Sequence, residues 1–234
     1  MIDFIEGEII YIDKPLHWTS FRVVRVVRAM LCRRLGLKKL KVGHAGTLDP
    51  LATGVMILCT GKNTKRIDEL QALTKEYVAQ VYLGATTPSF DLETTIDAEY
   101  PTAHITRELV EETLSTFTGN IEQIPPIYSA VKVAGKRAYE FARKDEVIEL
   151  KPKLLVIDSI KLIAYELPYI TIHVVCSKGT YIRALARDIG KALHSGAHLS
   201  ALRRTAVGEI TVDNCLKMDD LDCFFDVNIE SGNQ

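Results

Sequence analysis

Hydrophobic and polar positions recur along the first part of the chain in patterns typical of regular structure. The stretch 8–13 is rich in β-forming residues and stops at Lys14-Pro15, which predicts a strand ending there. Thr19-Ser20 then offers a helix N-cap. Over 21–34, valine, methionine and leucine side chains fill one arc of a helix, and arginines fill the opposite arc. This helix is therefore expected to pack by one side and to present guanidinium groups on the other.

The later part of the chain alternates between strand and helix patterns. The apolar run 55–59, bounded by Gly54 and Gly61, predicts a buried strand. In 75–84 every second residue is apolar, which places Tyr77 on an apolar face, where a tyrosine ordinarily packs into the core. The other expected elements are helices at 62–73, 105–117, 181–193 and 218–225 and strands at 153–165, 168–176 and 199–204.

One stretch, 43–54, fits neither pattern, since it contains three glycines, one histidine and a single carboxylate. Glycine permits left-handed backbone angles, and Pro50 keeps Asp49 out of the helical region. The stretch therefore predicts an irregular loop that presents Asp49. The same pattern also fits an aspartate that only caps a turn. The spacing before Gly61-Lys62 is wrong for a phosphate-binding P-loop, and one acid is too few for a calcium loop.

Length and composition limit the classes of protein to consider. The chain has 234 residues, enough for one large domain or two small ones, and its 47% hydrophobic and 25% charged residues are ordinary for a globular protein. The start of the chain does not resemble a signal peptide, and no apolar run is long enough to span a membrane, so we expect a cytoplasmic protein. The cysteines and histidines show no ligand spacing, and we predict no metal site.

Charge is segregated along the chain, although the net charge is only −1. Residues 14–48 contain nine Lys/Arg and no acid, while 84–126 contain eight acids and one base. Basic residues return in 132–144 and 178–204, and 205–234 is acidic. Basic segments that fold onto one face would supply a surface for nucleic acid. A single basic run, taken alone, is as well explained by a solvated face.

The loop sequence GHAGTLDPLATG resembles the catalytic signature of the TruB family of tRNA pseudouridine synthases. Other segments from about residue 8 to about residue 212 are similar to that family in the same order. They are Asp13-Lys14-Pro15 with Thr19-Ser20, Lys75-Glu76-Tyr77, Gln123-Ile124-Pro125-Pro126 with Tyr128-Ser129-Ala130-Val131-Lys132, Ser177-Lys178-Gly179-Thr180-Tyr181-Ile182-Arg183 and Leu202-Arg203-Arg204.

The resemblance implies an α+β pseudouridine synthase fold, in which helices flank a mixed, mostly antiparallel central sheet. It also implies an RNA-binding thumb insertion at about 121–150, within a catalytic domain over 1–212. For 213–234 we expect a short acidic helix and a tail, with no PUA domain, the RNA-binding domain that many bacterial members carry. Asp91 falls in a turn-rich acidic stretch that is less similar to the family.

The activity implied by the resemblance is the isomerisation of uridine to pseudouridine at position 55 in the T-arm of tRNA. The base is flipped out of the RNA, and no cofactor takes part. The implied catalytic residues are Asp49, Tyr77 and Arg183, and the implied substrate-binding residues are His44, Tyr77, Tyr181, Leu202, Lys14, Arg22 and Arg25. Arg183 is expected in the first turn of a helix, where the dipole disfavours a cation, and the family pattern nominates Asp49 as its compensating acid.

The expected partner is the T-arm stem-loop of tRNA, bound by a monomer without a guide RNA and without a membrane. Two other interpretations stay open. A guide-RNA-dependent synthase of the related eukaryotic and archaeal branch uses the same loop, but it relies on the appended domain that we do not expect here. A non-catalytic RNA-binding or tRNA-folding protein could be built on the same scaffold, although the intact Asp49 argues against it.

Overall fold

The computed structural model describes residues 2–129, 131–133, 135–142, 144, 146 and 148–229. The chain divides into two compact units. Unit 1 combines Met1–Lys75 with Arg203–Gln234, and unit 2 is Glu76–Leu202. The residues of strand β12 (Ala197–Val207) are shared between the units, and strand β4 (Lys75–Leu83) begins at their boundary.

Unit 1 is built on a mixed sheet whose strand order is β14-β1-β3-β12, with β2 paired to β3 and β13 paired to β12. Strands β1 and β14 are parallel, whereas β1 and β3 are antiparallel. Besides β12, the elements of this unit are β1 (Ile9–Lys14), α1 (Ser20–Arg34), β2 (Val42–His44), β3 (Ala52–Thr60), the 3-10 helix Gly61–Arg66, α2 (Ile67–Ala72), β13 (Ile210–Thr211), the 3-10 helix Val212–Asn214, β14 (Leu216–Lys217), the 3-10 helix Met218–Asp220 and α6 (Leu221–Asn228).

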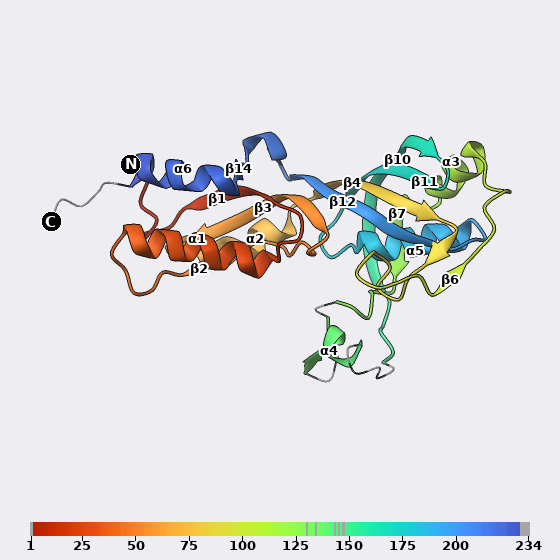
Figure 1. Cartoon of the computed structure of the whole chain (residues 1–234), viewed down its shortest axis with the longest axis horizontal. Coiled ribbons are helices and arrows are strands. Elements are labelled where there is room, and N and C mark those ends of the chain that lie inside the picture. The colour runs from red at the N-terminus through yellow and green to blue at the C-terminus, as the bar shows by residue number, and fades with distance from the viewer. Residues whose placement is uncertain are drawn as a thin grey trace. The chain divides into compact units, whose positions relative to one another are not determined.

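Both faces of the unit 1 sheet are covered by apolar side chains. On one face α1 and α6 lie together against β1 and β3, as Figure 1 shows. The buried side chains there include Ile12, Val27, Met56 and Phe225, which are fully or almost fully inaccessible. On the other face a second cluster contains Val55 and residues of α2. Because successive residues of a strand point to opposite faces, β3 serves both clusters and is buried along most of its length.

Unit 2 contains the strand order β12-β4-β11-β10-β7. Strand β10 pairs antiparallel with both β11 and β7. Besides β4 and β12, its elements are β5 (Ala85–Thr86), β6 (Ala98–Glu99), α3 (Arg107–Ser115), β7 (Gly119–Gln123), β8 (Lys132–Val133), β9 (Lys136–Arg137), α4 (Ala138–Ala142), β10 (Lys153–Glu166), β11 (Tyr169–Cys176) and α5 (Ile182–Ala192).

The unit 2 sheet is buried on one face only, which explains the alternating sequence of its strands. Every second residue of β4 and of β11 is buried, while the residues between them are partly exposed. Helix α3 contacts both β10 and α5. One buried face and one solvated face is the arrangement that antiparallel sheets commonly adopt. Among the described residues, no helix has both the length and the apolar character needed to cross a membrane.

Most of the expected elements are confirmed with shifts of a few residues. Thr19 caps α1 by accepting a hydrogen bond from the Arg22 amide, and Thr106 caps α3 in the same way. Gly36, with φ of 64°, follows the end of α1 as expected. The expected helix over 62–73 begins instead as the 3-10 helix Gly61–Arg66 and becomes α-helical only in α2.

The stretch 43–54 is less irregular than its composition predicts, so the expectation of a wholly irregular loop is wrong. Its first two residues belong to β2 and its last three to β3, because Gly43 pairs with Cys59 and His44 with Leu58. The irregular part is therefore 45–51, a loop held between two paired strands. At Gly54 a Cβ atom would lie 2.1 Å from the Arg204 carbonyl oxygen, and φ is 105°. Glycine is required there because β12 passes so close to the backbone.

Candidate active site

Asp49 lies in the loop 45–51 of unit 1, and neighbouring segments hold this loop through its backbone. The Ser20 hydroxyl donates to the Leu48 carbonyl and accepts from the Leu48 amide, both at 2.9 Å. The His17 amide donates to the Pro50 carbonyl at 2.8 Å, and the Ala52 amide donates to the Asp49 carbonyl at 3.0 Å. These bonds come from the segment 13–20 and from β3. The similarity of 13–20 to the family thus has a local physical reason, because this segment fixes the loop that carries Asp49.

Lys14, the last residue of β1, pairs with Gly54 of β3 and is completely buried. Its ammonium donates to the Pro15 carbonyl at 2.9 Å and to the Trp18 carbonyl at 2.7 Å. Burial lowers the pKa of Lys14 to about 8, while the charge of Asp49 acts in the opposite direction. The sequence predicts substrate binding for Lys14. That role stays a prediction, and the charges of Lys14 and Asp49 attract one another.

Arg204, in β12, is a second buried cation in unit 1, only 1% exposed. Its Nε donates to the Val55 carbonyl at 2.7 Å, and an Nη atom donates to the Gly46 carbonyl at 3.3 Å. It thereby joins β12 to β3 and to the Asp49 loop. Its neighbour Arg203 has a different partner, the carboxylate of Asp13, at 2.7 Å. The sequence placed Arg204 in a segment similar to the family but gave it no role, although its position in an alternating strand could have placed it on the buried face.

His44 occupies the end of β2, just before the loop, and is partly buried. Burial lowers the pKa of His44, and the positive charge of Arg204 lowers it further. Its imidazole is therefore held neutral at physiological pH.

Three expected site residues of unit 2 lie on elements that the sequence predicted. Tyr77 is on the buried face of β4 and is 8% exposed. Tyr181 is the N-cap residue of α5, and its amide donates to the side chain of Gln123 at 2.9 Å. Leu202 is partly buried at the end of the unit 2 portion of β12. The assignment of these residues to the uracil stays a prediction.

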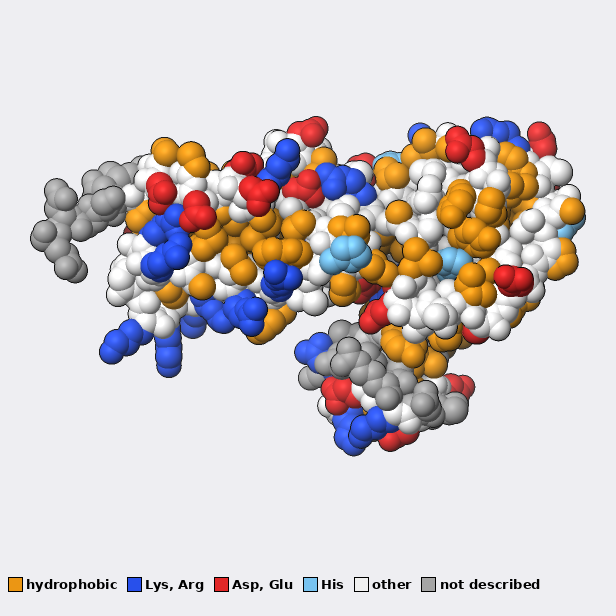
Figure 2. Space-filling view, viewed as in Figure 1, with side chains coloured by type: hydrophobic (Ala, Val, Ile, Leu, Met, Phe, Trp, Pro, Cys, Tyr) orange, Lys and Arg blue, Asp and Glu red, His pale blue; other side chains and the backbone are white. Residues whose placement is uncertain are grey.

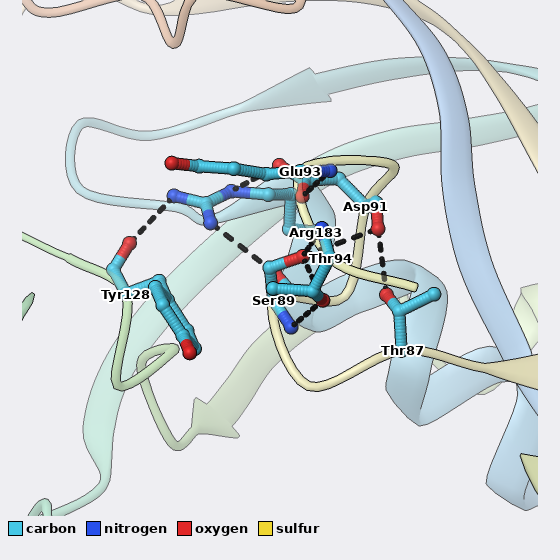
Figure 3. Close-up of polar contacts among 7 residues, drawn as sticks. All are labelled: Thr87, Ser89, Asp91, Glu93, Thr94, Tyr128 and Arg183. Atoms are coloured by element: carbon cyan, nitrogen blue, oxygen red, sulfur yellow. Dashed lines mark hydrogen bonds and ion pairs between the residues drawn. The ribbon is translucent and has the colours of Figure 1, made fainter. Parts of the chain in front are cut away.

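Arg183 lies in the first turn of α5 and is 5% exposed. In Figure 3 its guanidinium points toward the segment 87–94 and toward Tyr128. One Nη atom donates to the Ser89 carbonyl at 3.2 Å, the other donates to the Tyr128 carbonyl at 3.0 Å, and Nε lies 3.5 Å from a carboxylate oxygen of Asp91. Asp91 is itself 4% exposed. A carboxylate therefore does compensate this cation near a helix N-terminus, and Asp91 is one that the sequence left without a role.

The Asp91 segment is stabilised by its own hydroxyl groups. The Thr87 and Ser89 hydroxyls both donate to the Asp91 carbonyl, at 2.7 and 3.1 Å, and the Glu93 amide donates to the Asp91 carboxylate at 3.0 Å. Thr94 completes the turn by bonding to Ser89. Bonds within the 87–94 segment thus hold both the backbone and the carboxylate of Asp91 next to Arg183 (Figure 3).

The segment expected to form the thumb is fastened to α5 at its start. The Gln123 side chain donates to the Tyr181 carbonyl and accepts from the Tyr181 amide. Arg187, one turn after Arg183, donates to the Ile124 carbonyl at 3.1 Å. Further along, Lys136, Arg137 and Lys144 are exposed. Ala130 and Arg143, which belong to the expected motif and basic run, lie outside the described residues.

The two basic residues expected to bind substrate on α1, Arg22 and Arg25, are both exposed. The Arg22 guanidinium stacks 3.9 Å from the centroid of the Trp18 ring. At the other end of α1, Arg34 is paired with Asp222 and Asp226 of α6 at 2.5 and 2.8 Å. Figure 2 shows Lys and Arg side chains over α1 and Asp and Glu side chains along α6.

Comparison with known proteins agrees with the resemblance that the motifs predict. Residues 33–182 match the model of the TruB family pseudouridylate synthase N-terminal domain, and residues 183–230 match that of the tRNA pseudouridylate synthase B C-terminal domain. The chain is 66% identical over 228 residues to tRNA pseudouridine synthase B of Parabacteroides distasonis, covering 97% of each protein. It is 67% identical over 218 residues to tRNA pseudouridine synthase B of Phocaeicola vulgatus, covering 93% of each.

Solved structures show the same fold. The chain superimposes on a chain of the crystal structure of a Cbf5-Nop10-Gar1 complex with a TM-score of 0.72 and 30% identity, covering 99% of this chain and 58% of that one. A chain of an archaeal box H/ACA Nop10-Cbf5 complex gives a TM-score of 0.68 at 26% identity. The fold is therefore the expected α+β pseudouridine synthase fold.

Fold and motifs together define a pseudouridine synthase, an enzyme that isomerises uridine in RNA. The chain belongs to the TruB family of tRNA pseudouridine synthases, and its substrate is tRNA.

Proposed function

We propose that this enzyme acts on the uridine at position 55 in the T-arm, with Asp49 as the acid that meets the ribose or the base. The reaction breaks the bond between N1 of uracil and the ribose, forms a bond from C5 to the same ribose carbon, moves a proton from C5 and leaves one on N1. Product and substrate are isomers, so the reaction consumes no co-reactant.

The observation that carries the proposal is the setting of Asp49 within unit 1. A rigid loop, bonded to Ser20 and to the His17 amide, presents this single acid. The buried ammonium of Lys14 and the charge of Asp49 attract one another. A nearby cation favours the ionised carboxylate, which is the form needed for nucleophilic or electrostatic work.

The remaining expected residues receive roles toward the flipped uridine. His44 fills the space that the base leaves, and its lowered pKa supports this role because an uncharged ring inserts among stacked bases. Tyr77 stacks under the uracil and takes the proton from C5, Tyr181 and Leu202 form walls of the pocket, and Arg183 supplies positive charge. Stacking on an aromatic ring returns about 1–3 kcal/mol, comparable to the few kcal/mol that flipping costs.

The proposal also covers the surfaces by which the enzyme binds tRNA. Arg22 and Arg25 of α1 and the basic residues of the expected thumb contact phosphates, and the thumb closes on the T-arm. The chain works as a monomer in the cytoplasm, without a guide RNA and without a cofactor. The shape of the T-arm loop and the flipped base account for much of the recognition of tRNA, since proteins recognise folded RNA largely by its shape and by splayed-out bases.

The test is to incubate the purified chain with an unmodified tRNA transcript, without guide RNA, and to map pseudouridine at each position. We expect product at position 55, and none from a transcript carrying cytidine there. Asp49→Asn should bind tRNA with unchanged affinity and form product at least about a thousandfold more slowly, as expected when a group that acts on the reacting bond is removed. Asp68→Asn, the same change at an exposed carboxylate of unit 1, should react normally. Product from Asp49→Asn at the normal rate would refute the assignment.

A further inference from the structure

The surface around the start of α1 carries exposed aromatic and basic side chains close to the segment that holds the Asp49 loop. We call it the Phe21 surface and define it by Leu16, His17, Trp18, Phe21, Arg22 and Arg25. Phe21 is 67% exposed and Leu16 is 47% exposed. The apolar side of α1 packs through other residues, namely Val23, Val24, Val27 and Leu31. Phe21 therefore contributes little to the core of unit 1.

His17 adopts a backbone conformation that side chains disfavour. Its φ is 63°, in the left-handed region where glycine has no Cβ to clash. Its imidazole is exposed, and it has no hydrogen-bond or ion-pair partner among the described residues. The amide of His17 donates to the Pro50 carbonyl, next to Asp49, so the backbone of His17 lies against the loop 45–51. A glycine would hold that bond with less strain, so the histidine side chain is not explained by folding.

The charges on this surface suit a polyanion. Residues 14–48 include no acid. In the described part of unit 1, Arg33 and Arg34 form ion pairs with the acids of α6, whereas Arg22 and Arg25 form none. The Arg22 guanidinium is held over Trp18 at 3.9 Å, which limits the freedom it would lose on binding phosphate. The uncompensated charge of α1 is therefore concentrated at the end that carries Phe21.

We propose that the Phe21 surface binds an unpaired nucleotide of the RNA substrate, with a base stacked on Phe21, the His17 ring beside it, and flanking phosphates on Arg22 and Arg25. This inference rests on the proposed function, since it takes RNA as the ligand of unit 1. Aromatic stacking accepts any base, because each base has a π face, and adjacent guanidinium groups neutralise the backbone. An apolar protein partner fits less well, because five of the six residues are cationic or ring-bearing groups of the kind used for nucleic acid.

The first test measures the Kd of unmodified tRNA by fluorescence anisotropy over a range of salt concentrations. Phe21→Ala should weaken binding about 5- to 100-fold, the usual loss for one stacked base, with an unchanged slope of log affinity against log salt. Phe21→Tyr should bind like wild type, and Phe21→Leu should bind like Phe21→Ala. Arg25→Ala should instead reduce the slope by about one. The matched control is Val227→Ala in α6, where an apolar side chain is 74% exposed, and it should change nothing.

The second test separates binding from folding. His17→Gly relieves the left-handed strain, so it should raise the melting temperature by about 2–4 °C while weakening tRNA binding several-fold. A variant that is more stable and binds less well cannot be explained by misfolding. Wild-type affinity of Phe21→Ala would overturn the proposal, whatever the affinity of His17→Gly. So would full affinity of Phe21→Leu, which would indicate apolar docking without stacking.

Activity measurements distinguish this inference from the proposed function. With saturating tRNA, Phe21→Ala should form pseudouridine at the wild-type kcat, because the surface only binds. If the wild-type chain forms no pseudouridine but Phe21→Ala still lowers the affinity for tRNA, the proposed reaction is refuted and the surface is supported. Normal pseudouridine formation with unchanged affinity and KM in Phe21→Ala would refute the surface and leave the reaction intact.

Discussion

Two buried arginines, one in each unit, are used in different ways. Arg204 in unit 1 and Arg183 in unit 2 are 1% and 5% exposed, and each donates to two backbone carbonyls. Arg183 also has the carboxylate of Asp91 at 3.5 Å. Among the described residues, no carboxylate forms an ion pair with Arg204.

This difference in neutralising charge shows that a buried cation can change the pKa of its neighbours as well as stabilise the fold. The charge of Arg183 is partly neutralised by Asp91, and this arginine joins α5, the 87–94 segment and the start of the expected thumb. The charge of Arg204 is not neutralised in that way, and it lowers the pKa of both His44 and Lys14. Carbonyl dipoles satisfy its hydrogen bonds but leave its field acting on the Asp49 loop.

The largest effect is expected from removing the acid that compensates Arg183. Asp91→Asn keeps the shape and the acceptor for the Glu93 amide but leaves a buried guanidinium with less neutralising charge. We expect the free energy of unfolding to fall by about 2–4 kcal/mol, as when one partner of a buried pair is removed. Urea unfolding of the purified wild type and of Asp91→Asn measures this difference in the free energy of unfolding.

The control for Asp91→Asn is Asp97→Asn, at an exposed carboxylate six residues further along the chain. Its oxygen accepts from the Thr86 hydroxyl, and asparagine keeps that acceptor, so the change should cost less than about 0.5 kcal/mol. Equal stability of the two variants would mean that Arg183 does not depend on Asp91.

These contacts mark the limit of what the sequence could predict. The cap at Thr19 and the alternation of β4 follow from chemistry between near neighbours, so both were foreseen. The partners of Arg204 are about 150 residues away in the chain, and Asp91 meets Arg183 across 92 positions. A charged side chain is expected at the surface, because burial without partners is costly. Only the folded chain brings the carbonyls of Val55 and Gly46 to Arg204 and reverses that expectation.

The resemblance supplied the site residues that local patterns could not. Periodicity alone assigned Tyr77 to the core, and 75–83 is indeed a strand with Tyr77 on its buried face. Nothing in the pattern distinguishes a tyrosine that packs from one that faces a base. The same holds for Lys14, which is buried although a lysine after a strand is expected in solvent. The boundary drawn at residue 212 and the individual roles of the site residues stay predictions.

A smaller effect is expected from removing Arg204, the buried arginine of unit 1. Arg204→Met leaves the Val55 and Gly46 carbonyls without these donors, at a cost of about 2 kcal/mol in the free energy of unfolding. It also removes a positive charge that lowers the pKa of His44, so this pKa should rise toward its ordinary value. NMR titration of the histidine ring measures the change.

Arg204→Lys separates the two contributions of this arginine. It retains the charge but loses the fork of donors, so the pKa of His44 should stay low while stability falls. An unchanged pKa of His44 in Arg204→Met would show that burial alone lowers this pKa. It would then be wrong that the charge of Arg204, unlike that of Arg183, acts on neighbouring groups.

The smallest effect is expected from the pH dependence of stability, which tests whether burial lowers the pKa of Lys14. Burial lowers its pKa to about 8 from 10.5, so between these values the unfolded chain binds a proton that the folded chain has released. Relative to Lys14→Met, the wild type should therefore gain stability as the pH rises from about 8 to 10, by about 1–2 kcal/mol. Both hydrogen bonds can persist, because a neutral amine still has two donors for Pro15 and Trp18. Urea unfolding followed by the fluorescence of the single tryptophan measures the difference, and one that stays flat with pH would mean that Lys14 keeps its proton.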